Sequence, residues 1–337
     1  FFMAVNRGKR GLILNLKDPQ DLASAREIAS HVDVVIHNYR TGVADRLGLA
    51  YPDLHALHPG LVYCAVSGYG PSGPMASRPG VDLLFQAESG MLAVTGSPNG
   101  LPVKVGTNAA DVYAATTAAF AITAALLQRE RTGKGSEVHV ALRDAFVALQ
   151  ACWVSSYLAT GEQPQRLGSG SPFTAPTDIY RAQDGDLVLA VVNDMHWQIL
   201  CKALGLADLI SDPRLATNDS RVQHAEYLRT RVNEALAHRN VQEWINLLDV
   251  AGVPVGRVLD YGMVCDDPQI QHNEMVLELN HSLAGTIKVQ GSPIWMDSEK
   301  CVTKFPPPAL GEHSQEILHE YGCIMGAEQI SDPHGHL

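Results

Sequence analysis

A single carboxylate stands at the start of a long apolar segment. Between Lys104 and Arg129 the only charged side chain is Asp111, and the residues that follow it are mainly Ala, Thr, Ile and Leu. A helix without a polar face is buried nearly all round, so we expect a buried helix over residues 111–128. An ionised, dry and immobile carboxylate at its start has the properties of a carboxylate nucleophile.

The same position also suits a purely structural role for Asp111. Asp is a favoured N-cap because its side chain accepts a hydrogen bond from a backbone N–H that has no partner in the helix. The helix start favours an anion by about 0.3–1 kcal/mol, and the free carboxyl has a pKa of about 3.9, so we expect an ionised side chain at neutral pH. Local sequence alone favours the cap over the nucleophile.

Other candidate motifs carry less chemistry. Gly68, Gly70 and Gly73 match the G-x-G-x-x-G spacing of nucleotide-binding loops, but Pro71 and Pro74 prevent the helix that such a loop requires, so we expect a plain loop. The histidines lack the spacing of metal ligands, and there is no G-x-S-x-G nucleophile elbow. We therefore predict no metal site and no permanently bound cofactor.

Composition narrows the class of protein. The 337 residues carry a formal net charge of −11 without a long basic run, which argues against nucleic acid or an anionic membrane as partner. No stretch approaches about 18 uninterrupted apolar residues, and six singly spaced cysteines are typical of reduced thiols. We predict a soluble, cytoplasmic protein in which an anionic ligand would need a local basic patch.

The elements that must position Asp111 follow an alternating pattern. Strand-like segments, beginning with one over 12–16, interleave with helical segments, which predicts parallel βαβ units in an α/β fold. A further long helix is expected from Asp144 to about Thr160. We predict a large domain over 1–160, a Gly/Ser/Pro linker or loop over 161–177, a small α+β domain over 178–282 and a return to the large domain over 283–337.

Seven motifs in one order resemble the family III CoA-transferases, the CaiB/BaiF group that includes formyl-CoA, carnitine and succinyl-CoA-dependent CoA-transferases and α-methylacyl-CoA racemase. They are NRGKRGLILNLKDP, DVVIHNYRTGVADRLGL, HPGLVYCAVSGYGPSGP, RPGVDLLFQAESGMLAVTG, the helix at Asp111, RTGKGSEVHVALRDA and PPPALGEHSQEIL. The likeness spans the chain. It implies a Rossmann-like large lobe with a parallel sheet, a smaller lobe and an interlocked homodimer.

The resemblance also implies a chemistry and a set of site residues. Asp111 falls on the family nucleophile, which passes CoA from an acyl-CoA donor to a small carboxylic acid through a mixed anhydride and an aspartyl-CoA thioester. Coenzyme A is thus a substrate. Its expected contacts are Leu14, Lys17, Asn38, Tyr39, Arg40, Arg46, Pro79, Gly80, Val81 and Asp82. Gly168, Ser169 and Gly170 match a mobile glycine loop that shields the intermediate.

Two departures from the family pattern keep alternatives open. Racemases of the family carry a catalytic His directly before the Asp that matches Asp82, and Val81 stands there. The family also begins with a further strand and loop that carry CoA and active-site residues, which this chain lacks, so we expect the N-terminal part of the large domain to be incomplete. The alternatives are an acyl-CoA racemase or epimerase, and an inactive homologue that binds CoA or dimerises.

Overall fold

A computed structural model describes residues 1–301 and 305–323 of the chain. The chain forms two compact units. The first comprises residues 1–91, 105–155 and 265–337, and the second comprises 92–104 and 156–264. The second unit therefore receives a segment, 92–104, that lies well before the sequence-predicted small domain.

The first unit is built around a three-stranded parallel sheet with the order β1-β2-β3. Its elements are α1 (Phe2–Val5), α2 (Pro19–His31), β1 (Val34–His37), α3 (Val43–Leu47), α4 (Tyr51–Leu57), β2 (Val62–Ser67), α5 (Asp82–Glu88), α7 (Ala109–Thr132), β3 (Ser136–Ala141), α8 (Leu142–Leu149), α15 (Pro268–His272), β7 (Val276–His281), β8 (Gly285–Gln290), β9 (Trp295–Met296), β10 (Glu299–Lys300) and α16 (Ser314–Glu320). This is the α/β architecture that the alternating pattern predicts.

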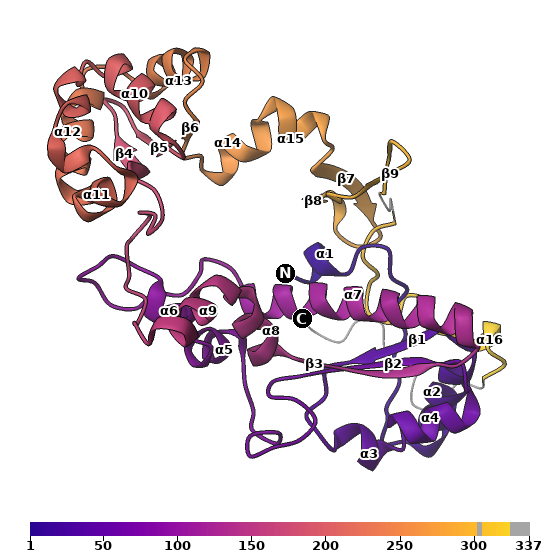
Figure 1. Ribbon diagram of the computed structural model, residues 1–337. Coiled ribbons are helices and arrows are strands. Elements are labelled where there is room, and N and C mark those ends of the chain that lie inside the picture. The colour runs from indigo at the N-terminus through magenta and orange to yellow at the C-terminus, as the bar shows by residue number, and fades with distance from the viewer. Residues whose placement is uncertain (302–304, 324–337) are drawn as a thin grey trace. The chain divides into compact units, whose positions relative to one another are not determined.

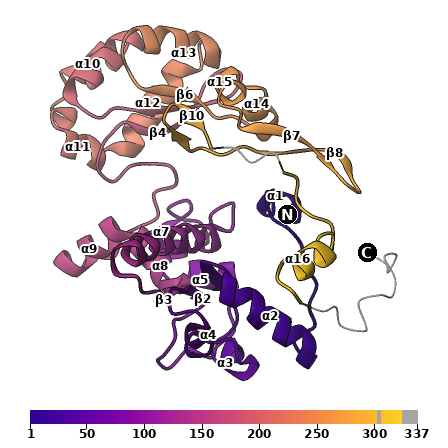
Figure 2. The same ribbon diagram turned by 90° about the vertical axis from the view of Figure 1, so that its right-hand side faces the viewer.

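Helices cover both faces of this sheet, with α7 on one side and α2 and α4 on the other (Figure 1). Successive side chains of a strand point to opposite faces, so Tyr63 of β2 packs with Leu54 of α4. Cys64, one residue on, packs with Ala114 and Ala118 of α7. Figure 2 shows the same layers after a quarter turn.

The second unit has an antiparallel sheet with the order β4-β5-β6, and its helices supply most of one apolar core. Its elements are β4 (Thr177–Arg181), β5 (Asp186–Ala190), α10 (Asp194–Ala203), η1 (Ala207–Ile210), η2 (Pro213–Leu215), α11 (Asn218–Gln223), α12 (Ala225–Leu236), α13 (Val241–Val250) and β6 (Val255–Arg257). Three further helices run across the unit boundaries: α6 (Met91–Val94), α9 (Ala151–Thr160) and α14 (Tyr261–Asp266).

The strand expected over 12–16 is wrong. The backbone N–H of Gly11 donates to Nδ1 of His313 at 3.1 Å, and that of Ile13 donates to Oγ of Ser314 at 3.2 Å. Arg10 forms ion pairs with Glu316 and Glu320 of α16. This segment binds the start of α16 instead of joining the sheet, a long-range pairing that local sequence does not encode.

The single helix expected from Asp144 to Thr160 is also wrong, because Gln150 separates α8 from α9. The Gln150 side chain is buried, and its Nε2 donates to the carbonyl oxygens of Phe146 at 2.8 Å and Ser89 at 3.1 Å. Hydrogen bonds from a side chain to backbone carbonyls offer an alternative to the regular helical ladder.

Helix α7 is less buried than its composition suggests. Ala110, Ala114, Ala118 and Ala125 are buried, but Phe120 is 76% exposed and Val112 and Leu127 are more than half exposed. The expectation of burial nearly all round is wrong for a single chain, because one sheet covers only one face of a helix. By length and composition alone α7 could span a membrane, a test that helices packed in a protein core also pass.

Candidate active site

The start of α7 is capped by a carboxylate from another helix. Oδ1 of Asp82 accepts hydrogen bonds from the backbone N–H groups of Ala110 at 2.9 Å and Asp111 at 3.2 Å. The N-cap residue Asn108 makes no capping hydrogen bond with its own side chain. Asp82 therefore takes the role of the N-cap side chain, although it lies 26 positions before the N-cap residue Asn108 in the chain.

Gln86 holds the capping carboxylate in place. Its Nε2 donates to Oδ2 of Asp82 at 2.6 Å and to the carbonyl of Thr107 at 3.2 Å, and its Oε1 accepts from the backbone N–H of Val105 at 2.9 Å. Both side chains are buried, Gln86 completely. One amide thus orients Asp82 and fixes the segment 105–107 that leads into α7.

Asp111 does not cap α7. It is the third residue of α7, so the expectation that it caps the helix is wrong. Its side chain is exposed, and in the described part of the chain no hydrogen bond to its carboxylate is found. Because Asp82 satisfies the backbone donors, the Asp111 carboxylate is available to react.

The electrostatics of Asp111 differ from the sequence expectation. Partial desolvation raises the pKa of Asp111 above its ordinary value, and the neighbouring negative charge of Asp82 raises it further. We expected the helix start to favour the charged form; desolvation and a like charge outweigh it. A carboxylate with a raised pKa is more basic, and a more basic oxygen is a better nucleophile.

The predicted CoA contacts after β1 form one exposed segment. Asn38, Tyr39 and Arg40 follow the last residue of β1 directly, and Arg46 lies in α3. All four side chains are exposed. This places two guanidinium groups near the carboxyl end of a parallel strand, an edge at which α/β proteins commonly bind ligands.

The other predicted CoA contacts lie in two places. Leu14 and the exposed Lys17 precede α2, whose start is capped by Asp18. Pro79, Gly80 and Val81 are exposed and lead into α5, whereas Asp82 is buried and both of its oxygens accept hydrogen bonds from the protein.

The predicted glycine loop belongs to the second unit, where two segments are tied together. The N–H of Gly168 donates to the carbonyl of Gly96 at 2.9 Å, and Nη2 of Arg166 donates to the carbonyl of Gly100 at 3.0 Å. Gly168 has a φ of +65°, and Gly170 lies against the carboxylate of Asp178, which is paired with Arg229. The segment 92–104, which continues directly into Val105 and α7, thus also holds the loop.

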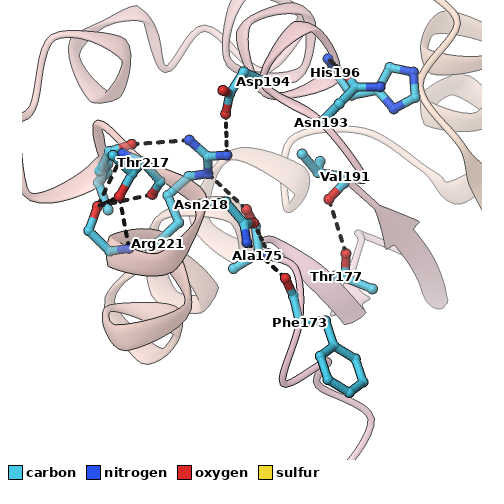
Figure 3. Close-up of polar contacts among 12 residues, drawn as sticks. Phe173, Ala175, Thr177, Val191, Asn193, Asp194, His196, Thr217, Asn218 and Arg221 are labelled. Carbon is cyan, nitrogen blue, oxygen red and sulfur yellow. Dashed lines mark hydrogen bonds and ion pairs between the residues drawn. The ribbon is translucent and has the colours of Figure 1, made fainter. Parts of the chain in front are cut away.

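A buried arginine supports the chain just after this loop, as Figure 3 shows. Arg221 is 1% exposed and donates to the carbonyl oxygens of Ala175 at 3.0 Å and Leu215 at 3.2 Å, and to Oδ1 of Asp194 at 2.6 Å. Its guanidinium also lies over the ring of Trp197. All three donor nitrogens are used, which makes the arginine a structural anchor.

Sequence reasoning missed the pairing of Asp82 with Gln86 and the cluster around Tyr69. The first had a signal, because Asp and Gln four residues apart face the same side of a helix. The cluster around Tyr69 had no signal in the sequence. The Tyr69 hydroxyl donates to Glu88 at 2.8 Å, and Glu88 forms an ion pair with Arg78. The guanidinium groups of Arg78 and Arg143 both lie over the Tyr69 ring. These residues come from three separate segments.

Comparison with known proteins places this arrangement in a family. The model of CoA-transferase family III matches residues 1–314. The chain belongs to CoA-transferase family III. The family prediction made from the seven ordered motifs, and with it the CoA-transferase class, is confirmed.

Individual members of CoA-transferase family III are similar over most of the chain. A succinyl-CoA:glutarate CoA-transferase of Mus musculus is 34% identical, with 95% of this chain and 73% of the relative aligned. An acetyl-CoA:oxalate CoA-transferase of Acetobacter aceti is 36% identical, with 96% and 82% aligned.

Solved structures of the family confirm the fold. A CaiB/BaiF family protein from Brucella suis matches with a TM-score of 0.85 at 32% identity, covering 95% of this chain and 83% of that one. Rv3272 from Mycobacterium tuberculosis matches with a TM-score of 0.84 at 33% identity, covering 94% and 85%. Acyl-CoA and a carboxylic acid are the substrates consistent with this family.

Proposed function

We propose that Asp111 is the nucleophile of a CoA transfer between two carboxylic acids. A carboxylate oxygen of Asp111 attacks the thioester carbonyl of acyl-CoA and the C–S bond breaks. CoA leaves as the thiolate, and the acyl group stays on Asp111 as a mixed anhydride. The thiolate attacks the Asp111 carbonyl carbon and releases the donor acid as its carboxylate. An aspartyl-CoA thioester remains.

The second half of the reaction repeats these steps with the acceptor. The acceptor carboxylate attacks the aspartyl thioester and displaces the thiolate, which forms a new anhydride. The thiolate then attacks the acceptor carbonyl, and Asp111 leaves as the free carboxylate. No net proton or electron is exchanged, so the protein needs a positioned carboxylate and a retained CoA, and no further acid or base.

The single observation that carries this proposal is the capping of α7 by Asp82 in place of Asp111. A nucleophile that also accepted hydrogen bonds from the helix start would lose electron density and would break those bonds on acylation. With Asp82 hydrogen-bonded to the N–H groups of Ala110 and Asp111, the helix end stays intact while Asp111 changes from carboxylate to anhydride to thioester.

We propose that CoA contacts Leu14, Lys17, Asn38, Tyr39, Arg40, Arg46 and the segment 79–82. The cations Lys17, Arg40 and Arg46 supply positive charge for CoA phosphates on a chain of net charge −11. That Gly168, Ser169 and Gly170 shield the intermediate from water stays a prediction of the family resemblance. Small dicarboxylates are the favoured acids, because relatives are named for succinate, glutarate, oxalate and mesaconate.

The protein is further proposed to be a cytoplasmic homodimer. Helix α7 exposes several apolar side chains, and a long apolar helix face is rarely left in water. This supports a second copy of the chain packing against α7. All six cysteines are free, in keeping with a reducing compartment.

Trapping the acyl-enzyme tests the mechanism. Incubation with succinyl-CoA, quenching with hydroxylamine and peptide mapping should place a hydroxamate on Asp111, and Asp111→Asn should abolish both label and turnover. A hydroxamate on another carboxylate, or near wild-type transfer by Asp111→Asn, would contradict the proposal. Glu88→Gln, which changes another carboxylate of the first unit, should still label at position 111.

An acyl-CoA racemase is the second candidate, and one observation weighs against it. Val81, where the racemases carry a catalytic His, is 65% exposed and has no group that accepts a proton. We expect no deuterium uptake at Cα of 2-methylacyl-CoA in D₂O above a blank without enzyme. An inactive CoA-binding homologue, the third candidate, would bind CoA but form no hydroxamate.

A further inference from the structure

The histidine before the proposed CoA segment has defined roles for both ring nitrogens. His37 is the last residue of β1. Its Nδ1 lies 3.1 Å from the backbone nitrogen of Tyr39, and its Nε2 lies 2.7 Å from the hydroxyl oxygen of Tyr63. That hydroxyl is also 3.0 Å from the carbonyl of Leu49.

These contacts allow one arrangement of protons. A backbone N–H can only donate, so Nδ1 of His37 accepts from Tyr39 and carries no proton. In the neutral ring the proton is then on Nε2, which donates to the Tyr63 oxygen. The Tyr63 hydroxyl in turn donates to the carbonyl of Leu49, which is an acceptor only. Each donor in this series of three hydrogen bonds has an acceptor when the histidine is neutral.

A second contact ties His37 to the side chain of Tyr39. The two rings are stacked, with centroids 5.1 Å apart and planes inclined by 25°. Tyr39 remains 39% exposed. His37 therefore holds both the backbone and the ring of Tyr39, between Asn38 and Arg40.

The surroundings of His37 favour the neutral form. Burial lowers the pKa of His37, the nearby His139 of β3 lowers it further, and Asp45 of α3 opposes both. His139 is itself 3.0 Å from Glu137. From β2, Tyr63 faces the ring, and burial raises its pKa to about 12, so it stays protonated and neutral.

We propose that His37 is a positioning residue for coenzyme A, which keeps residues 38–40 in their binding conformation only while its imidazole is neutral. This rests on the proposed function, which assigns CoA to that segment. Protonation puts a hydrogen on Nδ1 that points at the N–H of Tyr39, so two donors face each other and the segment shifts. CoA affinity therefore falls at acid pH.

Calorimetric titration of the full chain with CoA tests this at about pH 7.5 and at about pH 4.5, which is about two units below the ordinary histidine pKa because burial lowers the pKa of His37. His37→Asn keeps an acceptor, Oδ1, near the position of Nδ1 but cannot be protonated. CoA phosphate titrates in the same range, with a pKa of about 6. We therefore compare the change in CoA affinity between the two pH values in the wild type with the same change in His37→Asn. We expect wild-type affinity to fall about fivefold more, the equivalent of one hydrogen bond.

Two further variants separate positioning from folding. His37→Gln can keep the donor to Tyr63 but has no acceptor near Tyr39, and His37→Phe keeps the stacked ring without either hydrogen bond. Both should bind CoA about fivefold more weakly at either pH, while His37→Asn binds normally at about pH 7.5. Melting curves show whether each variant is folded before its affinity is compared.

The inference is overturned if His37→Gln and His37→Phe bind CoA as the wild type does, or if His37→Asn has the wild-type pH dependence. Arg46→Ala, measured in parallel, distinguishes this failure from a failure of the proposed function. If Arg46→Ala binds CoA weakly and the His37 variants bind it normally, only the role of His37 is rejected, and the proposed function stands. Normal binding by all of them rejects both the role of His37 and the contact between CoA and Arg46 in the proposed function.

Discussion

Oδ1 of Asp82 lies 3.2 Å from the backbone nitrogen of Asp111, so one carboxylate caps the helix that carries the other. The cap stabilises the start of α7, and its charge simultaneously raises the pKa of the carboxylate proposed to react. Asp82 therefore supports the start of α7 and also adds to the rise in the pKa of Asp111, of which desolvation is the larger cause.

Replacing Asp82 by Asn should shift the pH dependence of turnover. Turnover requires ionised Asp111, so kcat rises as pH rises through its pKa. Loss of the Asp82 charge lowers that pKa, and the rising limb should move to lower pH. Asp18→Asn, at the cap of α2, is the control and should leave the limb in place. An unmoved limb in Asp82→Asn would show that the two carboxylates do not interact.

Replacing Asp111 by Asn should stabilise the protein at neutral pH. The folded-state pKa of Asp111 is raised, so the native state binds more protons than the unfolded state just above the ordinary pKa, and stability falls as pH rises through this range. Asn carries no charge to desolvate beside Asp82. Thermal unfolding should show a higher Tm at pH 7 and a difference that shrinks as pH falls toward the ordinary carboxyl pKa of about 3.9, because well below that pH the carboxyl is protonated in both states. A lower Tm at pH 7 would contradict the desolvation argument.

Replacing Gln86 by Leu should destabilise the first unit by about 2–4 kcal/mol. The change leaves the buried Oδ2 of Asp82 without the Gln86 donor, at about 1–3 kcal/mol, and removes two partly buried hydrogen bonds to the backbone of Val105 and Thr107, at about 0.5–1.5 kcal/mol each. Urea unfolding measures the loss. Gln242→Leu changes an exposed glutamine and should stay within about 0.5 kcal/mol of wild type. Equal effects at both positions would rule out a special role for Gln86.

Replacing Arg221 by Met should destabilise the second unit by about 3–5 kcal/mol. It leaves the buried carbonyl groups of Ala175 and Leu215 without donors, at about 1–3 kcal/mol each, and leaves the exposed Asp194 without its ion-pair partner. Limited proteolysis should then cut faster near Ala175. Arg181→Met, which breaks the exposed pair with Asp186, should cost about 0–1 kcal/mol and leave the cleavage rate unchanged. A variant of Arg221 as resistant as the wild type would contradict the anchoring role.

Replacing Phe120 by Asp tests the proposed dimer. Phe120 is the most exposed large apolar side chain of α7, and a charge there is costly only if a partner covers it. Sedimentation should show a smaller species or a weaker dimer. Val250→Asp changes a side chain that is 91% exposed in the second unit and serves as control. Unchanged sedimentation of the Phe120 variant would remove α7 from the interface.

Sequence reasoning predicted the parallel sheet, the long helix at Asp111 and the family, because these depend on local periodicity and on the order of motifs along the chain. The segment over 12–16 shows where it failed. Its apolar residues fit a strand, yet the backbone of Gly11 and Ile13 binds His313 and Ser314 from the far end of the chain. Neither partner lies in the sequence window that predicted the strand.

The sequence by itself determined that an isolated carboxylate starts an apolar helix, since residue type and spacing are properties of the chain. Only the tertiary structure decided what that carboxylate does there. Local sequence favoured Asp111 as the cap, and folding brought Asp82 to the same backbone donors, held by a buried glutamine. A hydrogen bond is decided by which groups meet within about 3 Å, and for residues of separate helices that distance is set by packing and not by their order in the chain.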